Sequence, residues 1–271
     1  MIATVAQALE RARALGIERL DAQLILARQL GQSRAWLVAH DDALLPPGSG
    51  LAVEAAYARR GAGEPLAYLL GTQEFHGLTL QVDARVLVPR PDTETIVDWA
   101  LDLLAGRDGA RVVDLGTGSG AIALAVKQRC PAAQVYATDL SRDALDVARA
   151  NAVRLGLGVT FVGGSWWSAL GRQRFDLVLS NPPYIAEGDP HLPALRDEPI
   201  SALTSGRDGL DALREIVDGA AAHLNAGAWM LLEHGYDQAD AVQALFQDAG
   251  FKGVASRRDV GGRPRVTGAH R

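Results

Sequence analysis

Hydrophobic positions in the first 60 residues recur at every third or fourth place, a spacing that predicts helices. Thr4 stands where it can cap the first of them, and Gly16 and Gly31 stand where the first two can end. Pro46-Pro47-Gly48 then interrupts the pattern. We expect a small helical bundle, with helices over about 4–15, 17–30, 33–38 and 51–60.

The pattern changes in residues 64–91, where apolar side chains alternate at Leu78, Leu80 and Val82. Alternation predicts strands, so we expect a hairpin that links two domains. The segment Asp92-Thr93-Glu94-Thr95 then opens another helix, and its polar side chains are expected to cap the first turn. Its position between two domains makes the linker a candidate to line a functional site.

From residue 111 onward, apolar strands alternate with helices, which is typical of a βαβ sheet. The expected strands are 111–115, 134–138, 159–162, 175–180, 228–233, 253–258 and 265–268, and the expected helices are 121–129, 143–155, 209–224 and 239–249. The predicted fold class is α/β, a Rossmann-like sheet of seven strands that are mostly parallel. We divide the chain into a helical domain over 1–72, a hairpin linker over 73–90 and a sheet domain over 91–271.

Composition and charge exclude several classes of protein. The chain has 271 residues, 48% hydrophobic and 22% charged, with a formal net charge of −5, which argues against a broad electrostatic grip on duplex DNA. Its single cysteine, Cys130, excludes an internal disulfide and fits a reducing cytosol. The N-terminal segment carries charges every few residues, so we expect neither a signal peptide nor a membrane span. The histidines show no ligand spacing, and we predict no metal.

The most informative stretch is Leu177–Tyr184, LVLSNPPY, in which a strand-like run ends at two prolines. Proline continues neither a strand nor a helix, and α/β enzymes place their chemistry where such strands end. Asn181 offers a side-chain carbonyl and Pro182 a main-chain carbonyl, which can together accept both hydrogens of a planar amino group. Pro183 stiffens the loop, and Tyr184 can supply a flat face. A proline-stiffened turn with a capping Asn is the plainer alternative.

A glycine-rich loop, Gly116-Thr117-Gly118-Ser119-Gly120, follows the first strand of the expected sheet. Glycine lets main chain approach a ligand, and the following helix N-terminus adds positive potential. Asp139, after the next strand, can accept hydrogen bonds from both ribose hydroxyls. The loop also satisfies the loose dinucleotide fingerprint, so NAD is a candidate. Asp114 before the loop would favour a cation and disfavour a pyrophosphate, and NPPY has no evident use in hydride transfer, so a sulfonium cofactor fits better.

Two tryptophans, Trp166 and Trp167, follow the third expected strand of the sheet. They fall where an adenine ring would lie, and an aromatic face there would provide stacking. Partial burial against the sheet explains either tryptophan equally well.

These residues together resemble the PrmC/HemK family, the peptide chain release factor N5-glutamine methyltransferases. The resemblance covers nearly the full length, through the segments EPLAYLLGTQEF, VPRPDTE, VDLGTGSGAIALA, SNPPYI, LLEHG and RDVGGRPRVTG. NPPY with a glycine loop is shared with adenine-N6 methyltransferases, whereas VPRPDTE and the N-terminal domain are far more specific to this family.

The resemblance implies S-adenosyl-L-methionine as cofactor and S-adenosyl-L-homocysteine as product. It implies methyl transfer to the side-chain amide nitrogen (N5) of the glutamine in the GGQ motif of class-one peptide chain release factors. Carried over by position, the cofactor contacts fall on Gly116, Thr117, Gly118, Ser119, Gly120, Asp139, Trp166 and Asn181. The substrate glutamine is expected against Asn181, Pro182, Pro183 and Tyr184, of which Asn181, Pro182 and Tyr184 are the expected catalytic residues. Ser165 departs from the acidic residue that relatives carry before the first Trp, which puts the adenine contact there in question.

We expect a cytoplasmic monomer with a release factor as its protein substrate, no stable nucleic acid and no membrane. Glutamine N5-methylation of a ribosomal protein is one alternative. Adenine-N6 methylation of nucleic acid is another, disfavoured by the acidic balance and the lack of an obvious target-recognition domain. The basic cluster at Arg257, Arg258, Arg263 and Arg265 fits a solvated hairpin edge as well as a nucleic-acid contact. A non-catalytic nucleotide sensor would leave NPPY idle. The N-terminal domain either recognises the substrate or only packs.

Overall fold

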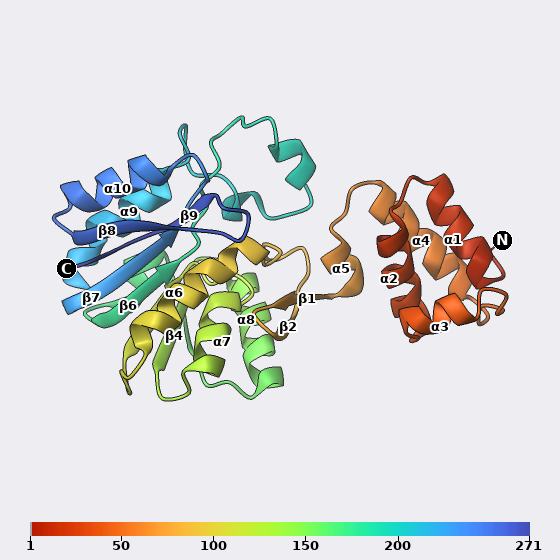
Figure 1. Cartoon of the computed structure of the whole chain (residues 1–271), viewed down its shortest axis with the longest axis horizontal. Helices are drawn as coiled ribbons and strands as arrows, with labels where there is room; N and C mark the ends of the chain where they lie inside the picture. Colours follow the sequence, from red (N-terminus) through yellow and green to blue (C-terminus); the bar gives the residue numbers. More distant parts are fainter. Residues whose placement is uncertain (1) are drawn as a thin grey trace. The chain divides into compact units, whose positions relative to one another are not determined.

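The computed structural model describes residues 2–271, and the chain forms two compact units, Met1–Thr72 and Gln73–Arg271. Figure 1 shows the elements of each unit in the colours of the sequence. A hairpin of strands β1 (Thr72–Phe75) and β2 (Leu78–Gln81) lies at the boundary.

The N-terminal unit is helical. Its helices are α1 (Val5–Ala14), α2 (Arg19–Leu30), α3 (Arg34–Ala39), α4 (Ser49–Gly61) and α5 (Leu66–Leu70). The Thr4 side chain caps α1 by accepting a hydrogen bond from the Gln7 main-chain N–H at 3.2 Å. Ile25, Leu26 and Tyr57 lie in a core of this unit's own. The four predicted helices are therefore confirmed, whereas α5 is too short, at five residues, to give a readable period.

The second unit contains a seven-stranded sheet in the order β5-β4-β3-β6-β7-β9-β8. The strands are β3 (Arg111–Leu115), β4 (Gln134–Asp139), β5 (Thr160–Gly163), β6 (Phe175–Ser180), β7 (Leu224–Glu233), β8 (Lys252–Arg258) and β9 (Pro264–His270). The pairs from β5 to β7 are parallel, and β9 is antiparallel to both β7 and β8. This confirms the predicted Rossmann-like α/β fold with a mostly parallel sheet.

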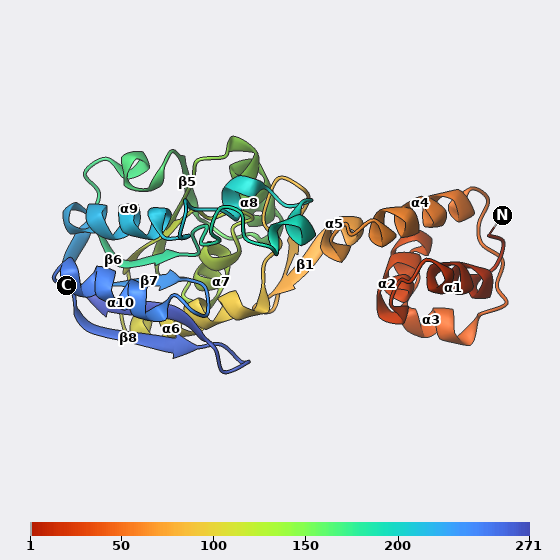
Figure 2. The same cartoon turned by 90° about the horizontal axis from the view of Figure 1, so that it is seen from above.

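Helices cover both faces of this sheet, as Figure 1 shows. One face carries α6 (Glu94–Leu104), α7 (Ala121–Arg129) and α8 (Arg142–Leu155). The other carries α9 (Asp211–Gly219) and α10 (Ala239–Asp248), and α10 packs against β8 and β9 (Figure 2).

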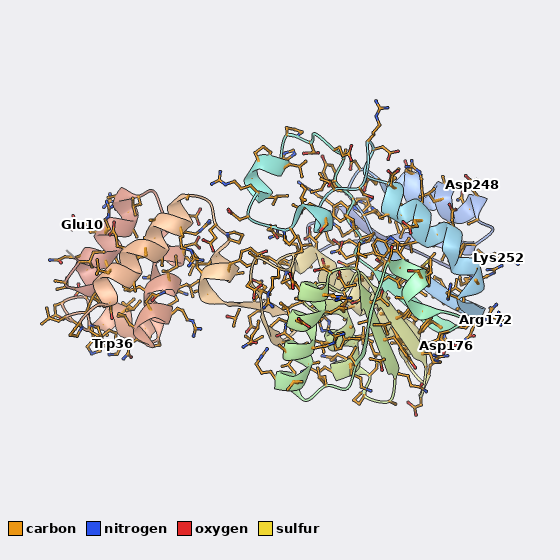
Figure 3. The ribbon with its side chains drawn as sticks, turned by 180° about the vertical axis from the view of Figure 1, so that it is seen from behind. Glu10, Trp36, Arg172, Asp176, Asp248 and Lys252 are labelled. Carbon is orange, nitrogen blue, oxygen red and sulfur yellow. The ribbon has the colours of Figure 1, made fainter. Side chains whose placement is uncertain are left out.

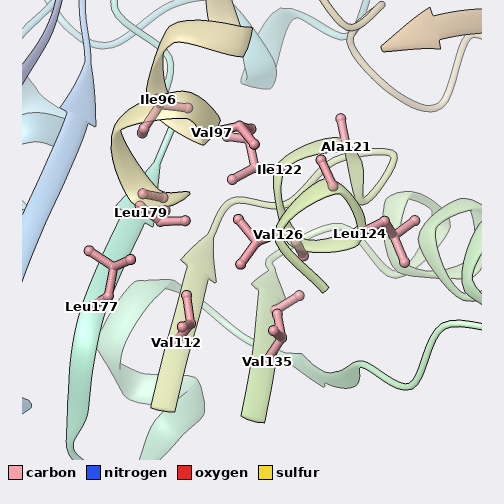
Figure 4. Close-up of a cluster of buried hydrophobic side chains, with 14 of the residues drawn as sticks. Ile96, Val97, Val112, Ala121, Ile122, Leu124, Val126, Val135, Leu177 and Leu179 are labelled. Carbon is pink, nitrogen blue, oxygen red and sulfur yellow. The ribbon is translucent and has the colours of Figure 1, made fainter. Parts of the chain in front are cut away.

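Alternation along the central strands supplies both hydrophobic cores. Val112 and Leu177 point to the face covered by α6 and α7, where they pack in the cluster with Ile96 and Ile122 (Figure 4). Their neighbours Val113 and Val178 are buried in the cluster of the opposite face. Because both faces are covered, the strands read as nearly continuous apolar runs, which is why the sequence located them well.

Short 3-10 turns join several of these elements: Pro91–Thr93, Trp166–Leu170, Leu192–Leu195, Ile200–Ala202 and Ala220–Ala222. The helix expected over 209–224 is shorter, because α9 ends at Gly219 and β7 already begins at Leu224. No helix within residues 2–271 is long and apolar enough to cross a membrane.

The expected capping of α6 by the segment from Asp92 to Thr95 is wrong. Neither the residue before the 3-10 turn nor the residue before α6 makes a side-chain capping hydrogen bond. These side chains bind other elements instead. Glu94 accepts from the His76 main-chain N–H at 2.8 Å, Asp92 pairs with Arg265 at 3.0 Å, and Thr93 accepts from Asn181 at 3.1 Å. The polar cluster therefore connects the hairpin, the last strand and the NPPY loop.

Candidate active site

The carboxyl ends of three adjacent strands bring the predicted chemistry together. Leu115 at the end of β3 is paired with Thr138 of β4 and Ser180 of β6. The next residues along the three strands, Gly116, Asp139 and Asn181, all line one cavity of about 440 Å³. This is where open parallel sheets bind ligands.

At the opposite edge of the sheet, where the parallel strands begin, Asp176 has a structural role. Asp176, labelled in Figure 3, lies near the start of β6 and accepts from the Arg111 main-chain N–H at 2.8 Å. Its other oxygen accepts from the Asn225 side chain at 2.8 Å. Both carboxylate oxygens therefore have partners that tie neighbouring strands together.

The glycine loop is folded against β4. The main-chain N–H groups of Gly116 and Thr117 donate to the Thr138 carbonyl at 2.9 and 2.8 Å. Gly116 has φ +74°, and a Cβ atom there would lie 3.0 Å from the Trp166 ring. Glycine is therefore needed at this position both for its conformation and for the close approach of Trp166.

Asp139 presents a fixed carboxylate to the cavity. Its two oxygens accept from the main-chain N–H groups of Gly118 and Ser141, each at 2.8 Å. Burial raises the pKa of Asp139, and these main-chain hydrogen bonds act in the opposite direction. The remaining lone pairs of the carboxylate suit hydroxyl donors, as the sequence predicted for a ribose.

Asp114 lies beneath the glycine loop, 1% exposed, and is absent from the cavity wall. Its Oδ2 accepts from the Thr117 hydroxyl at 2.6 Å, while Oδ1 has no partner. Burial raises the pKa of Asp114 to about 7. The sequence predicted that Asp114 favours a cationic ligand, but its carboxylate does not line the cavity and so makes no direct contact there. Asp114 supports the loop from below.

The structure separates the two tryptophans. Trp166 lines the cavity and has φ +40°, a conformation that non-glycine residues rarely adopt. Trp167 is 8% exposed, donates through Nε1 to the Ile216 carbonyl at 2.9 Å and stacks on His223. Trp166 therefore belongs to the site and Trp167 to the core. Ser165, the departure noted from the family pattern, also lines the cavity.

The four residues of NPPY have different surroundings. Asn181 and Pro183 line the cavity, while Pro182 is buried. The Tyr184 hydroxyl lies away from this wall and donates to Glu233 Oε1 at 3.4 Å. Burial raises the pKa of Tyr184, and the nearby Glu233 carboxyl adds to the effect. Of the predicted site residues, the wall includes Gly116, Thr117, Gly118, Ser119, Asp139, Trp166, Asn181 and Pro183, and omits Gly120, Pro182 and Tyr184.

The segment between the two domains, which the sequence made a candidate to line a functional site, does line the cavity through Arg90 and Thr93. The parts played by Glu198 and Pro199 had no signal in the sequence. Arg90 and Pro199 line the cavity, and Arg90 forms an ion pair with the buried Glu198. Glu198 also accepts from the Val88 main-chain N–H at 3.0 Å, which holds the segment after β6 against the segment before α6. Thr93 lines the cavity too. Its hydrogen bond to Asn181 crosses 88 positions, and only the fold reveals such a contact.

A mostly parallel sheet with a glycine loop, an acidic strand end and an NPPY loop at one edge defines a methyltransferase. The methyltransferase small domain family model matches residues 97–197, and the PrmC N-terminal domain model matches residues 1–71. The release factor glutamine methyltransferase of Bordetella pertussis is 51% identical over 258 residues, covering 94% of this chain and 96% of that protein. The chain belongs to the release factor glutamine methyltransferase family.

A second relative supports the family, and a solved structure supports the fold. The release factor glutamine methyltransferase of Xylella fastidiosa is 49% identical over 269 residues, covering 98% of this chain and 96% of that protein. The solved structure of the 16S rRNA N2 G1207 methyltransferase RsmC from T. thermophilus, in complex with AdoMet and guanosine, matches with a TM-score of 0.57. At 19% identity, with 74% of this chain and 49% of that chain covered, it shows the fold alone.

Proposed function

We propose that this enzyme transfers a methyl group from S-adenosylmethionine to the N5 side-chain amide nitrogen of the GGQ glutamine in class-one peptide chain release factors. The observation that carries the proposal is that Asn181 shares one cavity wall with the glycine loop, Asp139 and Trp166. Relatives that match almost the whole chain are named release factor glutamine methyltransferases. We further propose that the enzyme acts as a monomer without bound nucleic acid.

The residues present fit the cofactor. A cavity of about 440 Å³ is within the usual range for a small-molecule site. The Asp139 carboxylate would hold the ribose hydroxyls, Trp166 would flank the adenine, and the loop from Gly116 to Ser119 would bind the remainder through main chain. When bound, S-adenosylmethionine supplies an electrophilic methyl group on a positively charged sulfur.

The chain's own contribution is to hold a weak nucleophile in position. An amide nitrogen reacts poorly because its lone pair is delocalised into the carbonyl group. Asn181 Oδ1 and the Pro182 carbonyl would accept the two N–H hydrogens, which turns the nitrogen lone pair toward the methyl donor. Formation of the N–CH3 bond accompanies cleavage of the S–CH3 bond and leaves S-adenosylhomocysteine, and the methylated nitrogen, now strongly acidic, releases one proton. Aligned geometry of this kind is worth roughly 7–11 kcal/mol. Tyr184 would stiffen the loop from behind through its contact with Glu233.

Methyl transfer from labelled S-adenosylmethionine to purified release factor tests the proposal. We expect label on the wild-type factor and none on a factor whose GGQ glutamine is replaced by alanine. Label on a ribosomal protein or on nucleic acid, with none on the release factor, would overturn the proposed substrate. Binding of the cofactor without turnover on any of the three would overturn the proposed reaction.

Asn181→Ala separates positioning from cofactor binding. Because Asn181 would hold the amide to be methylated, we expect turnover to fall at least about a hundredfold. Cofactor affinity should fall far less than turnover, since Asn181 is one of several expected cofactor contacts and the glycine loop, Asp139 and Trp166 are untouched. Turnover is measured with saturating release factor and affinity by calorimetry. Equal losses in both would contradict the assigned role.

A further inference from the structure

A buried polar group lies directly behind Asn181. Thr93 is 3% exposed and Glu233 is 1% exposed, and they come from the start of α6 and the end of β7. Asn181 Nδ2 donates to Thr93 Oγ1 at 3.1 Å. On the far side, the Tyr184 hydroxyl donates to Glu233 Oε1 at 3.4 Å. The reacting loop is therefore supported by a chain of polar contacts that reaches into the core.

The Glu233 carboxyl group is the second polar neighbour of the Thr93 hydroxyl, beside Asn181. Burial raises the pKa of Glu233 to about 7, and the Thr93 hydroxyl, Arg265 and Tyr184 act in the opposite direction by favouring the charged carboxylate. Above that pH the carboxylate can only accept, and its Oε2 is the buried acceptor left for the hydrogen of the Thr93 hydroxyl. A hydroxyl has one hydrogen and two lone pairs. When that hydrogen faces Glu233, only lone pairs are left for Asn181, and Asn181 must present its NH2 group to Thr93.

The orientation of the Asn181 amide follows from this. With Nδ2 held by Thr93, the oxygen Oδ1 is the polar atom that Asn181 leaves for a ligand in the cavity. An oxygen acceptor suits the N–H groups of a side-chain amide. It repels the oxygens of a carboxylate of the same shape.

We propose that Thr93 is a positioning residue that makes this site select glutamine over glutamate. The inference rests on the proposed function, because it concerns the side chain to be methylated. Without the Thr93 hydroxyl, the side-chain amide of Asn181 is free to rotate by about 180° and direct its NH2 group toward the cavity. The site would then lose the acceptor that aligns the amide and gain a donor that accommodates a carboxylate. Sites that match a donor to an acceptor discriminate strongly, because the wrong ligand leaves buried groups unpaired.

The test uses the full-length enzyme and two peptides of the release factor loop, one with GGQ and one with GGE. The variants are Thr93→Val, which keeps the shape but removes the hydroxyl, and Thr93→Ser, which keeps the hydroxyl. Thr95→Val is the matched control. It is the same substitution two positions further along the chain, at a residue that does not line the cavity. Turnover is measured on GGQ peptide, and binding of both peptides by calorimetry at pH 8.

For Thr93→Val we expect turnover to fall about tenfold or more, and the preference for GGQ over GGE in binding to shrink by a similar factor. Cofactor affinity and melting temperature should stay close to those of wild type. Thr93→Ser should restore most of the turnover and the preference for GGQ, and Thr95→Val should behave as wild type.

Two results would overturn the inference while leaving the proposed function intact. One is a Thr93→Val enzyme that keeps the wild-type preference for GGQ. The other is a loss of GGQ binding, GGE binding and cofactor binding together, which would show a packing role. A wild-type enzyme that methylates neither release factor nor GGQ peptide would instead refute the proposed function, and this inference would fall with it.

Discussion

The proposed cofactor site can be tested by adding a single methyl group at Gly116, where the chain approaches Trp166 closely. In Gly116→Ala the new Cβ would lie 3.0 Å from the Trp166 ring, at φ +74°. Gly109→Ala is the matched control, because Gly109 has the same φ and nothing within 4 Å of an added Cβ. Both variants should lose about 1 kcal/mol of stability from backbone strain. Only Gly116→Ala should weaken cofactor binding, by about tenfold, in a calorimetric titration. Equal affinities would show that Trp166 does not contact the cofactor.

The raised pKa of the buried Asp114 carboxyl predicts that the stability of the fold depends on pH. Burial raises its pKa from 3.8 to about 7, so the folded chain holds this proton at pH values where the unfolded chain has released it. The Asp114 contribution therefore lowers the free energy of unfolding as pH rises from about 4 to 7, and it levels off above that. Asp114→Asn retains an acceptor for the Thr117 hydroxyl but cannot ionise. In urea unfolding without cofactor, its stability relative to wild type should increase by a few kcal/mol between pH 5 and pH 8. Parallel curves would contradict the assignment.

At the scale of elements, Asn151 of α8 joins the hairpin to the glycine loop. Its Oδ1 accepts from the Gln81 main-chain N–H at 2.7 Å. Its Nδ2 donates to the carbonyls of Gln81 and Ser119, both at 3.0 Å. The side chain is completely buried, and its hydrogen bond to the Ser119 carbonyl forms away from water, while the two to Gln81 are partly buried. One side chain thus fixes β2 and the glycine loop relative to each other.

Asn151→Ala should therefore destabilise the sheet unit by about 3 kcal/mol, since three main-chain groups lose a partner and the Ser119 carbonyl among them is buried. It should also weaken cofactor binding, because the Ser119 carbonyl is no longer held. The control is Asn225→Ala, which removes one hydrogen bond to Asp176 at the opposite edge of the sheet. Urea unfolding and cofactor titration measure both effects. If the two variants behaved alike, the proposed link to the loop would be refuted.

Helices and strands in which apolar residues recur at a regular spacing were predictable from the sequence. Contacts between side chains far apart in the sequence were not. The apolar runs of β3 and β6 and the alternation of strands with helices defined the sheet, because burial on both faces leaves a strong pattern. The polar start of α6 was misread as a capping segment. Threonine is a common capping residue, but the Thr93 hydroxyl accepts a hydrogen bond from Asn181, which lies in the loop after β6. Local sequence could not show this, since the partner is brought close only by the fold.

The same limit explains the candidate site. Gly116, Asp139 and Asn181 could be placed together because each follows a parallel strand, and parallel strands end at one edge. The direction in which Tyr184 points could not be predicted, because it depends on packing against Glu233 of β7. Motif residues locate a site, and the buried groups behind them decide which motif residues face the ligand.

At the scale of the whole chain, the cavity and the helical unit can be tested separately. Every cavity-lining residue lies between Arg85 and Ala202, within the unit Gln73–Arg271. The unit Met1–Thr72 has its own core, around Ile25 and Tyr57, and we propose that it recognises the release factor. A shortened enzyme starting at Gly71 retains both strands of the hairpin. It should bind S-adenosylmethionine and methylate a GGQ peptide within about threefold of the full chain, because it retains every residue that lines the cavity.

On intact release factor the shortened enzyme should lose at least about a hundredfold in kcat/KM, chiefly through KM, since the proposed recognition surface is removed. The isolated helical unit, added in excess, should compete with the full-length enzyme for release factor. Circular dichroism and cofactor titration establish that the shortened enzyme is folded before turnover is compared. Full activity on intact release factor would show that residues 1–72 only pack, and that the sheet unit alone recognises its protein substrate. Loss of activity on peptide and release factor alike, with cofactor binding retained, would show instead that the helical unit helps to form the reacting site.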